Sequence, residues 1–177
     1  MTLVPLRGFT LVETLVAVAI LTVALSGPFF AIQQSLVASY VARDDLIAAS
    51  LAQEAIEFIH SIRDDNYLYN LANPGSPRSW LYGLDGSGGV DCLEPKMCVV
   101  DPSQNEVETC VGTCATLYES PVHVYNQQGS GTATRYTRSV SVETISDHEV
   151  LMTVSVVWKT GHMDKSVTLT MTLQDWL

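Results

Sequence analysis

The sequence predicts an α+β protein in which a long N-terminal helix packs on an antiparallel C-terminal β-sheet. Three features predict this fold. An apolar run near the N-terminus leads into a stretch with helical periodicity, the C-terminal part alternates apolar and polar residues, and four cysteines lie in an irregular segment between them. At 177 residues, the chain is long enough for one membrane-length helix and one small domain.

Residues 11–32 form an apolar run in which Glu13 is the only ionisable side chain. At about 1.5 Å per residue, a helix of this length crosses a hydrocarbon layer of about 30 Å. A carboxylate inside such a helix is unfavourable unless it has a partner, which indicates a specific role for Glu13. Arg7 before the run predicts a cytoplasmic N-terminus and an exported C-terminal domain. A secretory signal peptide or a plain membrane anchor would share these features, but neither needs the glutamate.

The hexapeptide of residues 8–13, Gly-Phe-Thr-Leu-Val-Glu, resembles the class III signal of type IV prepilins and pseudopilins. The resemblance covers Arg7 to about Leu25. It implies that residues 1–8 are a leader that a prepilin peptidase removes by cutting between Gly8 and Phe9, and that the same enzyme methylates the new amino group of Phe9. It also implies that Glu13 pairs with the amino group of a neighbouring subunit. Such a pair would fix the axial register between subunits, because two buried charges that meet cost less than either alone.

Gly27 and Pro28 interrupt the predicted helix of residues 9–32. Proline removes a backbone donor and clashes with the preceding turn, so we expect a helix kink or a locally melted stretch at residues 24–28. In the major pilins, the helix-breaking proline usually lies further along. The position of Pro28 is therefore a departure from their pattern.

Residues 33–70 predict an amphipathic helix that continues the apolar one. No proline or glycine occurs between residues 29 and 71. A helix over residues 9–63 would be roughly 80 Å long at the α-helical rise. The stretch 51–57, with 62–64 after it, resembles minor pilins of the pilus-modification class. Apolar residues recur at three- and four-residue steps, which indicates one buried face: Leu46, Ile47, Leu51, Ala55, Phe58, Ile59 and Ile62.

Residues 71–117 predict an irregular loop that holds all four cysteines, Cys92, Cys98, Cys110 and Cys114. Its turn sequences are residues 73–77 and 85–89. In a small exported segment, four cysteines predict two disulfides, and the spacing leaves all three pairings open. A zinc site is the alternative, although the spacings are not the usual paired two-residue gaps.

Residues 118–177 predict the antiparallel sheet of the exported head. Apolar and polar residues alternate in 136–143, 150–158 and 166–173, and short polar links join these stretches. Short links imply antiparallel neighbours, so we expect a three-strand meander, extended by residues 121–125. The helical residues 43–63 would cover its apolar face.

Charge and residue pattern exclude several function classes. The net charge of −10 and the absence of a basic stripe argue against nucleic-acid binding. We expect no enzymatic activity, no cofactor and no metal, because the four histidines fall on different elements: His60, His123, His148 and His162. Asp64 to Asn66, and Asp85 with Asp91, offer oxygen ligands for Ca²⁺, but the calcium-loop pattern is absent.

The sequence thus predicts a minor pilin, membrane-bound by one helix and then assembled into a type IV pilus at the cell surface. Its expected partners are the prepilin peptidase, other pilin subunits, the inner-membrane assembly machinery and, before assembly, membrane lipid. A pseudopilin of a type II secretion or DNA-uptake system is the alternative within this class. A membrane-anchored surface binding module, with residues 73–117 as its contact surface, is the alternative outside it.

Overall fold

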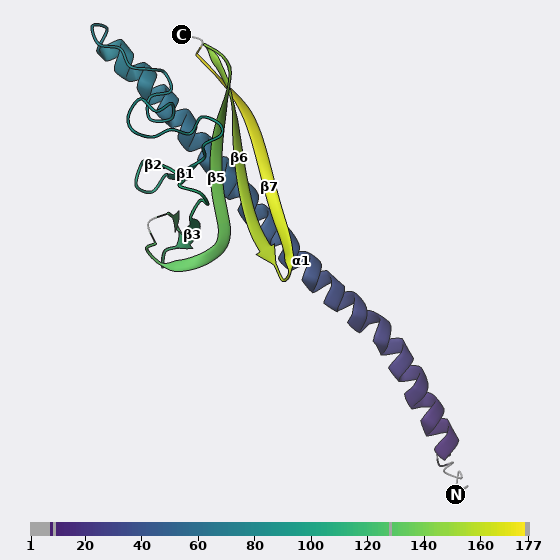
Figure 1. The fold of residues 1–177 in the computed structure, drawn as a ribbon. Helices are drawn as coiled ribbons and strands as arrows, with labels where there is room; N and C mark the ends of the chain where they lie inside the picture. The colour runs from purple at the N-terminus through teal and green to yellow at the C-terminus, as the bar shows by residue number, and fades with distance from the viewer. Residues whose placement is uncertain (1–7, 9, 128, 176–177) are drawn as a thin grey trace, which may run out of the picture. The chain divides into compact units, whose positions relative to one another are not determined.

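The computed structural model describes Gly8, residues 10–127 and residues 129–175, and it confirms the predicted α+β fold (Figure 1). The chain divides into two units, Met1–Arg43 and Asp44–Leu177, and the boundary falls within the helix. One helix, α1 (Leu11–Ala72), is followed by seven strands: β1 (Cys98–Asp101), β2 (Glu106–Thr109), β3 (Thr116–Glu119), β4 (Tyr125–Asn126), β5 (Thr132–Ser146), β6 (Glu149–Thr160) and β7 (Met163–Gln174).

Within the N-terminal unit, α1 is unbroken through Gly27 and Pro28. Pro28 cannot donate a hydrogen bond to the Ala24 carbonyl, yet residues 24–28 keep the helical conformation, so α1 tolerates this one missing bond. Of the two outcomes expected here, local melting is therefore not observed. The kink stays a prediction.

In the C-terminal unit, β5 is the centre of the sheet (Figure 1). One edge of β5 pairs with β6, and β6 pairs along its whole length with β7. The opposite edge pairs with β3 and, further along, with β1. All of these pairings are antiparallel, which confirms the three-strand meander. Its hairpins turn at residues 147–148 and 161–162, and Gly161 takes the positive φ of 63° that the second turn requires.

The stretch predicted to be irregular contains more structure than its sequence indicates. Strands β1 and β2 form a hairpin within it, and β3 begins just before its end. The predicted extension at residues 121–125 is also corrected: Tyr125 and Asn126 form β4, which pairs with β3 and not with the meander. These strands were missed because they are only two to four residues long, and all four residues of β1 are buried, so no alternation appears.

The helix covers the sheet as expected, but through a partly different set of side chains, and the predicted Ile47 and Ile62 are only partly buried against the core. Leu46, predicted to be buried, is 72% exposed. Ala48 and Ala52, which the periodicity argument passed over, are fully buried. The helical side chains in the core are Ala48, Leu51, Ala52, Ala55, Phe58 and Ile59.

Two buried charges tie the helix to β5. The fully buried Arg138 donates from Nη1 to the Glu54 carboxylate at 2.6 Å and to the Leu51 carbonyl at 2.9 Å. Asp44, 3% exposed, accepts hydrogen bonds from Arg135 and from the Tyr136 hydroxyl. Burial and the Asp44 carboxylate raise the pKa of Tyr136, so the phenol keeps its proton and remains a donor.

Two asparagines, one turn apart on α1, hold the segment that follows the helix. Asn66 is 1% exposed and donates from Nδ2 to the carbonyls of Trp80 and Tyr82, both at 3.0 Å. Asn70 exchanges two hydrogen bonds with the backbone of Arg78. These bonds satisfy backbone groups that would otherwise need water, so residues 78–82 are fixed against the last turns of the helix.

Both predicted disulfides are present, and they join neighbours in sequence. Cys92 pairs with Cys98 and Cys110 with Cys114, so none of the four is free. A zinc site made of these thiols is thereby excluded. The first bond connects the start of β1 to the loop before it, and the second closes a short loop after β2.

Peptide mapping can check this pairing, because Glu106 and Glu108 lie between the two bonded pairs. Cleavage after glutamate, without reduction, should release one fragment with the first disulfide and a separate fragment with the second. Mass spectrometry of the digest would show both, and a reduced, alkylated sample serves as the control. Nested or crossed pairing would keep the fragments joined, and four alkylatable thiols would contradict both disulfides.

Candidate functional site

The candidate site is the N-terminal part of α1, where the helix begins immediately after Thr10. The Glu13 backbone N–H donates to Thr10 Oγ1 at 3.2 Å, and the Thr14 N–H donates to the Thr10 carbonyl at 3.2 Å. Thr10 is therefore the N-cap. A threonine followed three residues later by glutamate is a known helix-start pattern, so residues 10 and 13 could have predicted this boundary. The sequence analysis did not use it.

Glu13 lies in the first turn of α1 and is exposed. A negative charge there is favoured by the unpaired N–H groups and the dipole of the helix, which offsets part of its cost in an apolar environment. Its expected partner, the amino group of Phe9 in another subunit, lies outside the described residues. The pairing itself stays a prediction.

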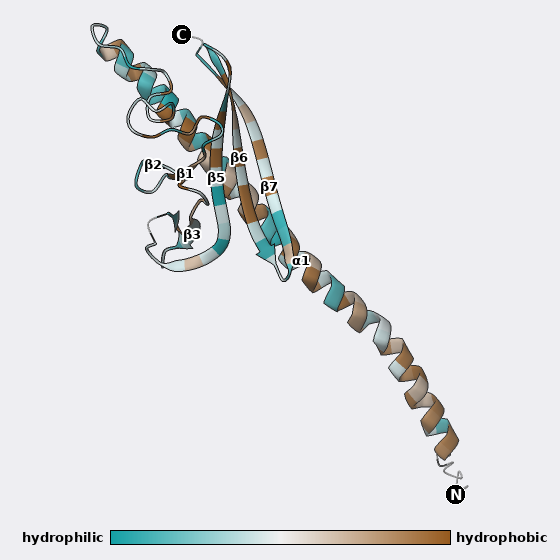
Figure 2. Ribbon diagram, viewed as in Figure 1, coloured by the Kyte–Doolittle hydropathy of each residue, from teal (hydrophilic) through white to brown (hydrophobic). Residues whose placement is uncertain are grey.

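Between residues 14 and 32, the surface of α1 is almost entirely apolar (Figure 2). The helix is long and apolar enough to cross a membrane, and none of the residues in its most apolar window is buried. The few hydroxyls donate to backbone carbonyls of their own helix: Thr14 to Leu11, Thr22 to Ala19 and Ser26 to Val23, at 2.8–2.9 Å. Because these polar groups are satisfied internally, the surface suits hydrocarbon or other apolar helices.

Gly8, the predicted cleavage residue, is exposed, and a Cβ added to it would meet no atom within 4 Å. A peptidase could reach the backbone here without displacing any described part of the chain. Phe9 and residues 1–7 lie outside the described residues, so the cleavage and methylation positions stay predictions.

The four histidines lie on separate parts of the described chain. In the described parts of the chain, no three His, Cys, Asp or Glu side chains are grouped so that they could hold a metal ion. The Lys96 ammonium, which bonds the Asp91 carboxylate, lowers the pKa of that group. Three histidines contact separate partners: His60 the Met171 sulfur, His123 the Glu119 carboxylate and His148 the Asp175 carboxylate.

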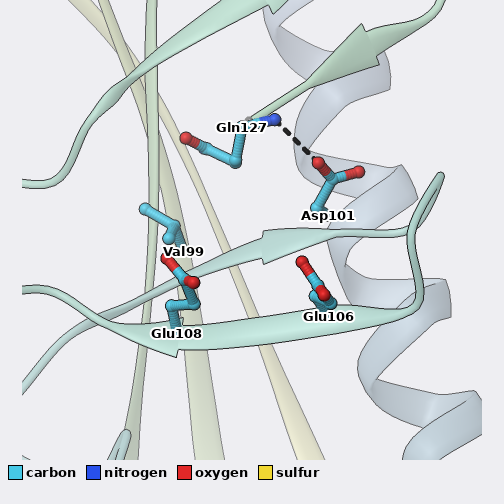
Figure 3. Close-up of a pocket in the computed structure, with 5 residues that line it drawn as sticks. All are labelled: Val99, Asp101, Glu106, Glu108 and Gln127. Carbon is cyan, nitrogen blue, oxygen red and sulfur yellow. Dashed lines mark hydrogen bonds between the residues drawn. The ribbon is translucent and has the colours of Figure 1, made fainter. Parts of the chain in front are cut away.

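The structure also brings together an acidic hollow that the sequence did not predict. Asp101, Glu106 and Glu108 line it together with Val99 and Gln127, and its volume is about 350 Å³ (Figure 3). Asp101 is already engaged, because its carboxylate accepts from the Gln127 backbone N–H at 2.8 Å and from Ser103. The β1–β2 hairpin creates this grouping, and that hairpin was not predicted from the sequence.

Comparison with known proteins agrees with the N-terminal geometry. Residues 7–27 match the family model described as the prokaryotic N-terminal methylation motif. No curated protein and no solved structure matches the chain. The motif implies processing by a prepilin peptidase and contact with pilin assembly machinery in general, and with the apolar helix it indicates membrane anchoring. The match, the capped apolar helix and the α+β fold together support a prepilin- or pseudopilin-type protein.

Proposed function

We propose that the chain is a minor pilin, a low-copy subunit that moves from the membrane into a type IV pilus. The match of residues 7–27 to the methylation motif carries this proposal. It is supported by the exposed apolar surface of α1, which needs lipid or neighbouring helices to cover it. In a filament, the N-terminal helices of other subunits would provide that cover, and the disulfide-bearing head would face outwards.

The choice of a minor pilin over a secretion pseudopilin has narrower support. Residues 51–57 and 62–64 resemble the pilus-modification class, and Pro28 lies earlier than the proline of major pilins. We propose a structural role and no enzymatic one, since all four cysteines are in disulfides and cannot act as nucleophiles.

Processing provides the direct test. A Gly8→Leu chain should stay in the membrane as the full-length precursor, because a bulky side chain at the cut blocks close approach of the peptidase. The wild-type chain should instead begin at Phe9 and carry one added methyl group. Intact-mass and N-terminal spectrometry of the chain from a host with a prepilin peptidase would measure both.

Gly27→Leu is the matched control, because Gly27 also has no atom within 4 Å of an added Cβ and lies away from the cut. It should mature normally. Normal maturation of Gly8→Leu would contradict the prepilin assignment and leave a plain membrane anchor. Detection of the mature chain in sheared pili, and not only in the envelope, would separate the pilin from the pseudopilin.

A further inference from the structure

A hollow of about 450 Å³ lies at the C-terminal end of α1, within the exported unit. Three separate segments form its walls: residues 63–71 of the helix, residues 78–80 and the end of β7 at residues 174–175. We call it the helix-end pocket. Its size is within the usual range for small-molecule sites, and no residue of the methylation motif contributes to it.

The walls of the helix-end pocket are fixed before any ligand arrives. Asn66 and Asn70 hold residues 78–82 by the four hydrogen bonds described above. The guanidinium of Arg78 lies over the rings of Tyr69 and Tyr82, at 4.2 and 4.9 Å from their centroids. A site held in this way loses little conformational freedom when it binds, which favours recognition of a small ligand.

The charges of the lining balance. Arg63 and Asp64 form an ion pair at 2.6 Å, and the remaining two charges, Arg78 and Asp175, are also of opposite sign. A strongly charged ligand would meet a like charge as well as an opposite one. The electrostatics therefore favour a neutral ligand.

The uncharged part of the lining combines flat apolar rings with hydrogen-bonding groups. Tyr67 and Trp80 are half-buried aromatic residues of this lining, and Gln174 adds an exposed amide that can donate and accept, whereas the Asn70 amide is engaged with the Arg78 backbone.

We propose that the helix-end pocket binds a neutral, polyhydroxylated ring, that is, one uncharged sugar unit of a glycan. Such a ring has an apolar C–H face that can stack on an aromatic side chain and a rim of hydroxyls that pair with amides and charged groups. The proposal does not depend on filament assembly, because every lining residue belongs to the exported unit.

Saturation-transfer NMR on the full chain tests this, in a zwitterionic detergent that carries no sugar head group. The probes are the methyl glycosides of glucose, galactose, mannose and N-acetylglucosamine, with glucuronic acid and inorganic phosphate as charged comparisons. At least one neutral glycoside should show saturable transfer to its ring protons. Tyr67→Ala and Trp80→Ala should weaken its binding by about tenfold, the upper value for one aromatic contact.

Trp80→Ala keeps the hydrogen bond from Asn66, since that bond ends on the backbone carbonyl. Trp80 also packs against the hydrophobic core, so Gln174→Ala, which changes an exposed residue at the end of β7, provides the pocket variant that leaves the core intact. Tyr118→Ala, a half-buried tyrosine outside the pocket, is the matched control and should bind normally. The proposal is overturned if no neutral glycoside binds, if glucuronic acid or phosphate binds more tightly, or if the pocket variants bind as well as the control.

Discussion

Replacing Arg138 by alanine should lower the free energy of unfolding of the C-terminal unit by about 3 kcal/mol or more. The side chain is 0% exposed and joins three parts of the fold, because Nη1 bonds Leu51 and Glu54 on α1 while Nη2 bonds the Val100 carbonyl on β1 at 2.7 Å. The substitution leaves these acceptors unpaired and opens a cavity. Urea unfolding of the purified chain, followed by circular dichroism, would measure the loss.

The neighbouring charges give this prediction its controls. Lys159→Ala removes a charge from β6 whose side chain is 75% exposed, and it should change stability by less than about 0.5 kcal/mol. Glu54→Ala should also destabilise, since it leaves the Arg138 charge buried without its counter-ion, and the double variant should lose less than the sum of the two. If the stability loss of the double variant equals the sum of the two single losses, Arg138 and Glu54 are not coupled. A loss below about 1 kcal/mol for Arg138→Ala would contradict the structural role of this side chain.

Glu13→Gln should abolish entry into filaments while leaving expression, membrane insertion and cleavage intact. The change keeps the length of the side chain and removes only the charge. The expected fall in sheared filaments is at least about tenfold, because a charge pair in hydrocarbon is worth more than the ~1.4 kcal/mol that tenfold requires. Quantitative immunoblots of sheared and membrane fractions would measure it.

Thr10→Ala separates this role of Glu13 from its place in the helix cap. It removes the Thr10 oxygen that accepts a hydrogen bond from the Glu13 N–H, which lowers helix stability by about 1 kcal/mol, and it leaves the Glu13 carboxylate in place. This variant should still enter filaments. If Thr10→Ala enters filaments as poorly as Glu13→Gln, loss of the helix cap explains the defect, and the pairing of Glu13 with a neighbouring subunit is contradicted. The pairing is also contradicted if Glu13→Gln enters filaments at the wild-type level.

Long helices and strands with a regular spacing of apolar residues could be predicted from the sequence. Short strands, and sites built from segments far apart in the chain, could not. The alternation in β5 placed Arg138 on the inward face, but its acceptors lie 38 to 87 residues away, and no local pattern identifies them. The disulfide pairing was open because the spacing allows three arrangements. The helix-end pocket draws on three separate segments, so only the folded chain brings Tyr67 and Trp80 together.

The nearest-neighbour disulfides also bear on the order of events when the chain crosses the membrane. Each bond spans only six or four positions, so its two thiols meet before β5 exists. If the C-terminal unit is exported in chain order after α1, Cys92 can oxidise with Cys98 and then Cys110 with Cys114, each with the next partner to appear. The oxidation machinery would then need no reshuffling step, and the sheet would assemble around loops that are already closed.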